Sequence, residues 1–177
     1  MRVFLTGGTG LLGSHLAQHL VDGGHEVRAL VRPASDSSFL AAIGSDLVEG
    51  DVTDPVERLA GLMGGCTHLV HGAALVYTGG GWDSIAEVNV AGTERILSAA
   101  ARSGVRKAVH ISSVAVYGNR DAGSDEGVSF THALADRDHY ARSKREAEVE
   151  ARRVERETGL PVRVVRPSAV YGEREIG

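Results

Sequence analysis

The sequence predicts an α/β fold in which helices cover both faces of a doubly wound parallel sheet. Two observations lead to this prediction. Short apolar runs alternate with longer segments of helical periodicity along the chain, which is the pattern of repeated strand–helix–strand units. Most of the apolar runs are continuous rather than alternating, as expected for strands that are covered on both faces.

The expected elements follow from these runs and from the residues that punctuate them. Six segments are the expected strands: Arg2–Thr6, His25–Val31, Asp46–Glu49, His68–His71, Lys107–Ile111 and Val162–Arg166. Helical periodicity predicts helices near residues 11–22, 55–63, 83–103 and 139–158. Asp83 is the expected residue before the third helix, and Gly104 and Gly159 are expected to follow the third and fourth.

Two segments interrupt the alternation, and both would leave the carboxyl ends of strands. They are the glycine run 79–81 and the long polar segment 118–138. Open α/β sheets bind their ligands at this edge, so either segment could take part in a site. For the glycine run, a flexible connection is an equally good interpretation.

The first strand runs directly into Gly7, Gly10 and Gly13, and an amphipathic segment follows at once. Glycines allow the backbone to approach a pyrophosphate closely, and the N-terminus of the helix offers N–H groups to it. The spacing Gly-x-x-Gly-x-x-Gly between a strand and a helix therefore indicates dinucleotide binding. We expect residues 1–177 to form one dinucleotide-binding domain, a Rossmann-like doubly wound parallel sheet.

The end of the second strand usually distinguishes the two nicotinamide cofactors. An acidic residue there binds the adenosine ribose, whereas an arginine accommodates a 2′-phosphate. Here Arg32 follows the strand, and no acidic residue lies between it and Asp36. Arg32 together with Ser35, Ser37 and Ser38 has the composition of a phosphate pocket, which predicts NADP(H) over NAD(H). The alternative is a solvated arginine at a strand end.

Tyr140 and Lys144 lie four residues apart, on one face of the last expected helix. A tyrosine has an ordinary pKa of about 10 and is a poor base at neutral pH. A lysine ammonium at roughly 4 Å would contribute on the order of 4 kcal/mol, which would lower the tyrosine pKa by about three units, to near 7. Ser112 and Ser113, at the end of the fifth strand, could place a hydroxyl beside it, although such pairs are more often turns.

Composition and charge exclude several other classes of protein. The 177 residues carry a net charge of −4 with both signs interspersed, so neither a nucleic-acid partner nor a membrane partner is expected. The single cysteine, Cys66, fits a small buried side chain in a reducing cytoplasm, and a strand at the N-terminus argues against a signal peptide. His15 and His19 have the spacing of a metal pair but lack a third ligand, so no metal is expected.

Together these residues resemble the extended short-chain dehydrogenase/reductase family, also described as the NAD-dependent epimerase/dehydratase family. The arginine-ended second strand looks most like the dihydroflavonol-reductase-like branch, which implies reduction with NADPH. The motifs fall in family order and cover nearly the whole chain: Thr6-Gly-Gly-Thr-Gly-Leu-Leu-Gly13, Gly50-Asp-Val52, His71-Gly-Ala-Ala74, Asn89-Val-Ala-Gly-Thr93, Ser112-Ser-Val-Ala-Val-Tyr-Gly118, Tyr140-x-x-x-Lys144 and Arg166-Pro-Ser-Ala-Val-Tyr-Gly172.

The resemblance implies a role for each matching position. Tyr140 would be the acid/base, Lys144 its electrostatic partner and a ribose ligand, and Ser113 would orient the substrate oxygen. Asn89 would belong to the active-site helix, or would be a structural helix amide. The expected cofactor-binding residues are Gly7, Gly10, Leu11, Leu12, Gly13, Arg32, Asp51, Val52, Ala73, Ala74, Lys144, Pro167 and Ser168.

The implied reaction is hydride transfer between NADPH and a small organic carbonyl or alcohol. Sugar-nucleotide dehydratases of the family carry an Asp-Glu pair just after the catalytic hydroxyl residue, whereas this chain has Val114-Ala115, so elimination is not expected. One alternative is a nucleotide-sugar 4-epimerase with tightly bound NAD. A second is a non-catalytic NAD(P)-binding regulatory protein, against which the Ser-Tyr-Lys set argues.

The resemblance also leads to expectations for the whole protein. Substrate contacts in the family come largely from segments beyond the motif that ends at Gly172, so we expect the C-terminal substrate-binding segments to be lacking here. The chain would then be a fragment or the N-terminal part of a longer protein. The helices near 83–103 and 139–158 would pair into a homodimer, although a solvated helix face with ion pairs is an equally good interpretation.

Overall fold

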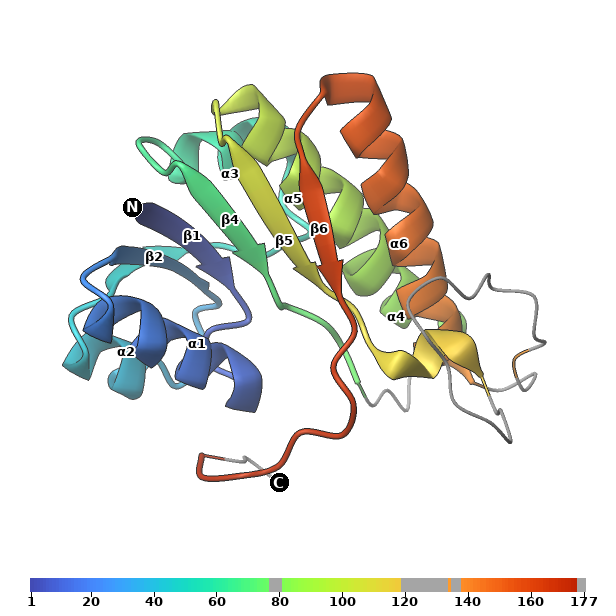
Figure 1. The fold of residues 1–177 in the computed structure, drawn as a ribbon, viewed down its shortest axis with the longest axis horizontal. Coiled ribbons are helices and arrows are strands. Elements are labelled where there is room, and N and C mark those ends of the chain that lie inside the picture. The colour runs from blue at the N-terminus through green and yellow to red at the C-terminus, as the bar shows by residue number, and fades with distance from the viewer. Residues whose placement is uncertain (77–80, 119–133, 135–137, 175–177) are drawn as a thin grey trace.

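The computed structural model describes residues 1–76, 81–118, 134 and 138–174, and it confirms the predicted α/β architecture (Figure 1). All strand pairs are parallel, and they form one sheet. Five strand starts and five strand ends agree with the expected ones. The strands are β1 (Arg2–Thr6), β2 (Glu26–Val31), β3 (Asp46–Glu49), β4 (His68–His71), β5 (Lys107–Ile111) and β6 (Val162–Val165).

The strand order β3-β2-β1-β4-β5-β6 shows that the sheet is doubly wound. The chain starts in the middle at β1 and proceeds through β2 to the edge strand β3. It then returns to β4, beside β1, and proceeds through β5 to the opposite edge at β6 (Figure 1). The order therefore reverses between β1 and β4, and the connections that follow these two strands leave the sheet in opposite directions. This reversal is the point at which such sheets form a ligand-binding crevice.

Helices cover both faces of the sheet (Figure 1). The helices are α1 (Leu11–Asp22) and α2 (Ser38–Ala42) on one face, and α3 (Val56–Leu62), α4 (Gly81–Ala86), α5 (Gly92–Arg102) and α6 (His139–Thr158) on the side of the other. A π-helical segment, η1 (Glu87–Ala91), joins α4 to α5, and a 3₁₀ segment, η2 (Val114–Tyr117), follows β5.

The helix boundaries differ from the expected ones in a few places. The expected helix near 83–103 begins at Gly81, so Asp83 lies in its first turn and not before it. Gly104 and Gly159 do follow helices, and both have the positive φ that glycine adopts at no steric cost. Helix α2 and segment η2 were not expected, because a helix of five residues shows no clear periodicity.

Apolar side chains form a separate core on each face of the sheet. Phe4, Leu59 and Ile96 belong to the core between the sheet and α3, α5 and α6. Leu5 and Leu40 belong to the core between the sheet and the helices α1 and α2. Phe4 and Leu5 are neighbours in β1 and point to opposite faces, as strand geometry requires. Each such fully buried side chain contributes about 1.5–3 kcal/mol to stability relative to an exposed one.

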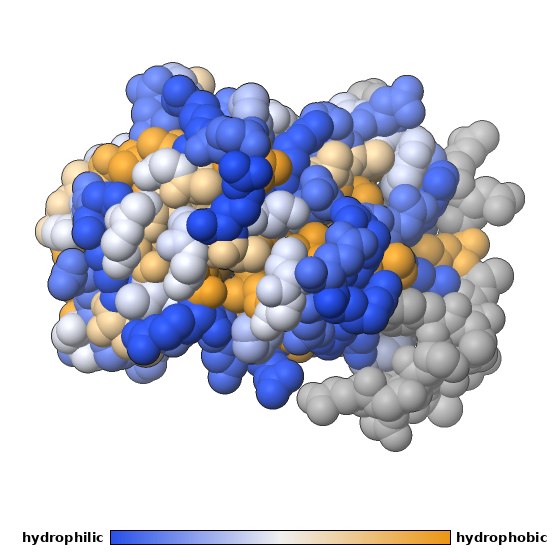
Figure 2. Space-filling view, turned by 90° about the horizontal axis from the view of Figure 1, so that it is seen from above, coloured by the Kyte–Doolittle hydropathy of each residue, from blue (hydrophilic) through white to orange (hydrophobic). Residues whose placement is uncertain are grey.

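The face of the described residues that is seen from above is mostly hydrophilic (Figure 2). In the view from above, hydrophilic side chains cover much of the surface, and apolar ones lie in small areas between them (Figure 2). Within the described residues, no helix combines the length and the apolar character needed to cross a bilayer. Cys66 is buried, and burial raises the pKa of its thiol. Residues 79 and 80 and most of the segment 118–138 lie outside the described residues.

Candidate functional site

A cavity of about 790 Å³ lies at the carboxyl ends of the strands, where the strand order reverses. This volume is within the range of small-molecule sites. Residues from both halves of the sheet line it, together with the start of α1, α6 and the segment after β6. All the expected cofactor-binding residues are among them: Gly7, Gly10, Leu11, Leu12, Gly13, Arg32, Asp51, Val52, Ala73, Ala74, Lys144, Pro167 and Ser168.

The glycine turn after β1 is shaped by close backbone contacts. Gly7 has φ +75°, and a Cβ on it would lie 2.6 Å from the backbone nitrogen of Ala73. A Cβ on Gly13 would lie 2.0 Å from the carbonyl oxygen of Gly7. Only glycine therefore lets the turn pack against the end of β4 and lets α1 start directly beneath the turn. The first residues of α1 line the cavity, where unpaired N–H groups of a helix favour an anion.

Two of the four residues expected to form a phosphate pocket, Arg32 and Ser35, line the cavity at the end of β2. Arg32 is exposed and lines the cavity together with Ser35. Ser37 and Ser38 do not line it, because they form the start of α2. Asp36 accepts a hydrogen bond from the backbone N–H of Ser38, and the hydrogen bonds from Ser38 lower the pKa of its carboxyl. A phosphate site at Arg32 and Ser35 stays a prediction.

Ser113, Tyr140 and Lys144 line the same cavity. Ser113 caps the 3₁₀ segment η2, and its Oγ accepts a hydrogen bond from the backbone N–H of Ala115 at 3.1 Å. The Ser113 side chain acts on Tyr140 by lowering the pKa of its phenol. Lys144 follows Tyr140 by one helical turn, and its Nζ donates to the carbonyl oxygen of Ile111 at 2.9 Å. The end of β5 and the start of α6 thus bring the three expected catalytic side chains together.

The expected pKa of Tyr140, near 7, is wrong for this structure. Burial of the ring raises the pKa of Tyr140 above its ordinary value, and the Ser113 side chain lowers it by less. The Nζ of Lys144 lies 5.9 Å from the centre of the Tyr140 ring and binds Ile111 instead. Burial also lowers the pKa of Lys144 to about 8. Tyr140 is therefore a protonated phenol at neutral pH, which suits a proton donor.

Asn89 lies in η1 and does not line the cavity. Its Oδ1 accepts a hydrogen bond from the backbone N–H of Leu75 at 2.8 Å. Its Nδ2 donates to the carbonyl oxygen of Leu75 and to Oγ of Ser143, both at 2.9 Å. Since Leu75 lines the cavity and Ser143 lies between the two catalytic candidates on α6, this amide holds both walls in place. Single π-helical turns are often found at functional sites.

The segment after β6 crosses the carboxyl edge of the sheet toward α1 (Figure 1). His15 on α1 donates from Nε2 to the carbonyl oxygen of Glu173 at 3.0 Å, and its Nδ1 lies 2.6 Å from a guanidinium nitrogen of Arg174. His15, which has the spacing of a metal pair with His19, therefore holds the segment after β6 against α1. Among the described residues, no group of metal-ligating side chains comes together.

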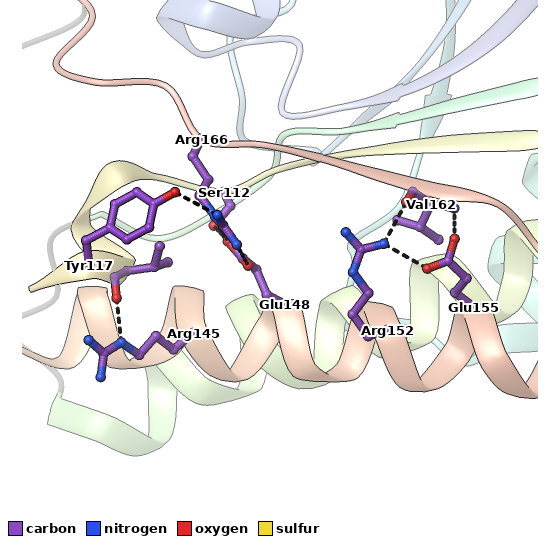
Figure 3. A network of polar contacts seen from close by, with 9 residues as sticks. Ser112, Tyr117, Arg145, Glu148, Arg152, Glu155, Val162 and Arg166 are labelled. Carbon is purple, nitrogen blue, oxygen red and sulfur yellow. Dashed lines mark hydrogen bonds and ion pairs between the residues drawn. The ribbon is translucent and has the colours of Figure 1, made fainter. Parts of the chain in front are cut away.

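Sequence reasoning missed a buried polar network behind the site (Figure 3). Glu148 on α6 accepts hydrogen bonds from Oγ of Ser112 and from the guanidinium of Arg166. The signal for it was present, because Glu148 follows Lys144 by four residues and so shares its helix face. An acidic residue on a long charged helix looks solvated, however, until its partner after β6, Arg166, is known.

The chain is similar to proteins of one enzyme family along its whole length. A profile of the NAD dependent epimerase/dehydratase family matches residues 3–176. The chain is 35% identical to a putative dihydroflavonol 4-reductase of Synechocystis sp., over 98% of its own length and 50% of the relative's. It is 33% identical to a 3 beta-hydroxysteroid dehydrogenase/Delta 5-->4-isomerase of Mycobacterium tuberculosis, over 97% of its own length and 47% of the relative's.

Solved structures give the same result. A dTDP-glucose 4,6-dehydratase from Streptomyces venezuelae with NAD bound superimposes with a TM-score of 0.83 at 33% identity, over 99% of this chain and 58% of that one. The chain thus spans about half the length of the curated relatives it matches. Fold, motifs and comparisons agree, and they confirm the resemblance to the extended short-chain dehydrogenases/reductases. The chain belongs to the NAD-dependent epimerase/dehydratase family.

Proposed function

We propose that this chain transfers a hydride between a nicotinamide cofactor and a small organic carbonyl or alcohol. The observation that carries the proposal is that Ser113, Tyr140 and Lys144 line the same cavity as the glycine turn after β1. When bound, the cofactor would supply or accept the hydride. The residues that fit it are those of the glycine turn and the ends of β2, β3 and β4.

The side chains of the site divide the remaining work. Tyr140, protonated at neutral pH, would donate its phenolic proton to the carbonyl oxygen of the substrate during reduction. Ser113 would hydrogen-bond the same oxygen and hold it beside the phenol. Lys144 would stabilise the phenolate that remains and would bind the ribose of the cofactor with its other donors. Its raised pKa keeps the phenol of Tyr140 protonated at neutral pH, which is the form that carbonyl reduction requires.

Tyr140→Phe tests this mechanism. The ring remains and only the proton donor is lost, so we expect turnover to fall by at least about 100-fold while cofactor affinity stays within about twofold. Tyr171→Phe is the matched control, because Tyr171 is exposed and does not line the cavity. Steady-state rates on a panel of ketones and hydroxysteroids, which the names of the relatives suggest, and cofactor titrations give both quantities. Undiminished turnover in Tyr140→Phe refutes the mechanism.

Within this function we propose a preference for NADP(H). Arg32 and Ser35 line the cavity at the end of β2, where a 2′-phosphate would lie, and no acidic residue lies between them. Arg32→Asp removes a phosphate partner and adds a repelling charge, so it should reverse the preference. Arg106→Asp, the same change on an exposed loop outside the cavity lining, should leave it unchanged. A wild-type protein that binds NAD(H) more tightly than NADP(H) contradicts the assignment.

A second candidate function is 4-epimerisation of a nucleotide sugar with NAD. A UDP-glucose-4-epimerase from Stenotrophomonas maltophila with bound NAD is 30% identical to this chain, with a TM-score of 0.78 over 94% of this chain. Co-purification of NAD and interconversion of nucleotide sugars would distinguish this function from reduction. Elimination is not proposed, because Val114 and Ala115 place no carboxylate at the cavity after Ser113.

A further inference from the structure

Glu148 holds the end of β6 and the end of β5 against α6 through a single carboxylate (Figure 3). Its side chain is 5% exposed. Its Oε1 accepts hydrogen bonds from Nε of Arg166 at 2.9 Å and from Oγ of Ser112 at 2.5 Å. Its Oε2 accepts from Nη2 of Arg166 at 2.7 Å. A bidentate pair between arginine and carboxylate is the strongest and most directional form of this contact.

The partners of Glu148 adjoin the walls of the site. Ser112 directly precedes Ser113, and Arg166 directly precedes Pro167, and both of these neighbours line the cavity. Ser113 and Pro167 lie on different segments, whose relative position no local pattern determines. A shift of the Glu148 carboxylate would therefore move two walls of the cavity relative to α6.

The negative charge of Glu148 also acts on Lys144, one helical turn away on α6. Lys144 is 3% exposed, and burial lowers its pKa to about 8, while the negative charge of Glu148 raises it. Burial keeps two neighbouring histidines uncharged, since it lowers the pKa of each. The other titratable or charged groups described beside Lys144 or Glu148 are thus neutral or cationic near neutral pH: Tyr140 on α6, His71 on β4, His110 on β5 and Arg166 after β6.

We propose that Glu148 is a positioning residue of the Ser-Tyr-Lys site, whose buried carboxylate keeps Lys144 in the ammonium form and fixes the ends of β5 and β6 through Ser112 and Arg166. The inference rests on the proposed function, because the charge of Lys144 affects the reaction only if Lys144 acts in it. A neutral amine would neither stabilise a phenolate by its charge nor offer three donors.

Glu155 provides a matched control on the same helix (Figure 3). Its Oε1 accepts a hydrogen bond from the backbone N–H of Val162 at 2.9 Å, and its Oε2 binds Arg152 at 2.8 Å. Glu155 therefore also ties α6 to β6, but at the other end of the strand. It lies roughly 16 Å from Lys144 along the helix, against roughly 6 Å for Glu148. Replacing Glu155 therefore removes a contact between α6 and β6 without removing a charge near Lys144.

The sequence allows the charge of Lys144 to be measured directly. It contains two lysines, Lys107 and Lys144, and Lys107 is exposed. With ¹³C at the lysine ε-carbons, NMR of the cofactor-free protein follows both side chains across pH. We expect the Lys144 midpoint to fall by about one pH unit in Glu148→Gln and to stay unchanged in Glu155→Gln. Unfolding would move it the other way, toward about 10.4, so the sign separates the two effects.

The pH dependence of kcat/KM for carbonyl reduction completes the test. In Glu148→Gln its alkaline limb should move to lower pH by the same amount as the Lys144 midpoint, and in Glu155→Gln it should not move. An unchanged Lys144 midpoint in Glu148→Gln, or an equal shift in Glu155→Gln, overturns the inference. A shifted midpoint in a protein that reduces no carbonyl supports the effect of Glu148 on Lys144 and refutes the proposed function instead.

Discussion

Two glycines of this chain, Gly13 and Gly61, differ completely in what a side chain would meet. At Gly13 a Cβ would lie 2.0 Å from the carbonyl oxygen of Gly7 and 2.7 Å from its carbonyl carbon. At Gly61, inside α3, nothing lies within 4 Å of a Cβ. The first glycine is thus required by the packing of the turn beneath α1, whereas the second lowers the stability of a helix without filling any need.

We therefore predict opposite effects of alanine at these two positions. Gly13→Ala should lower the free energy of unfolding by about 1–3 kcal/mol and weaken NADP(H) binding at least about tenfold, because the turn must shift. Gly61→Ala should raise the free energy of unfolding by roughly 0.4–1 kcal/mol and leave binding unchanged. Urea unfolding and cofactor fluorescence titrations measure both. Normal cofactor affinity in Gly13→Ala would show that the turn does not form the site.

At the residue scale, the sequence predicted positions better than chemical states. The residues expected to bind a cofactor all line the cavity. The glycines of the turn, Arg32 and Lys144 follow from local patterns, whereas the resemblance to the family implied the others. The pKa expected for Tyr140 was wrong, because it depends on what Lys144 binds. That partner, the carbonyl oxygen of Ile111, comes from another element and leaves no mark in the local sequence.

At the scale of elements, β4 and β5 carry a buried pair of histidines. The rings of His71 and His110 stack with their centres 5.3 Å apart. His71 is hydrogen-bonded to the hydroxyls of Thr6 and Thr93, whereas neither ring nitrogen of His110 has a hydrogen-bond partner in the described part of the chain. Burial lowers the pKa of both, to about 3 for His71. Both imidazoles are therefore neutral in the folded protein near neutral pH.

Because both histidines are neutral in the folded protein, we predict that the free energy of unfolding falls as the solution becomes more acidic. Below pH about 6.5 the unfolded chain protonates both imidazoles, whereas folded His71 stays neutral down to pH about 3. The contribution is complete above pH about 6.5. Below that pH it falls by up to about 1.4 kcal/mol per pH unit for each histidine that stays neutral in the folded protein, and for His71 it does so down to pH about 3. His110→Phe should remove one of the two slopes. Urea unfolding from pH 7 to about 4.5 measures it, and equal slopes in variant and wild type contradict the prediction.

The predicted elements show where periodicity is sufficient and where it is not. All six strands were expected, because buried parallel strands are continuous apolar runs. The helix near 83–103 was expected as one piece, yet it contains the π-helical segment Glu87–Ala91. This segment places Asn89 against Leu75 and Ser143, contacts with other parts of the chain that no helical pattern encodes.

At the scale of the whole molecule, the strand order explains why distant motifs meet. The glycine turn follows β1, and Ser113 follows β5, and both line the crevice created by the reversal between β1 and β4. A homodimer through α5 and α6 stays a prediction. Arg153 on α6 forms ion pairs with Glu94 on α5 and with Glu150 and Glu157 on its own helix.

The cavity also makes the cofactor a thermodynamic component of the fold. Its walls come from both halves of the sheet, so a bound cofactor would be released whenever either half unfolds. Ligand at about 100 times its Kd would then add about 2.7 kcal/mol to the free energy of unfolding. The melting temperature should rise with the logarithm of cofactor concentration, and at a given concentration the rise should be larger for NADPH than for NADH. A pair of melting curves thus reports the choice of cofactor without any substrate, and equal curves would exclude a preference.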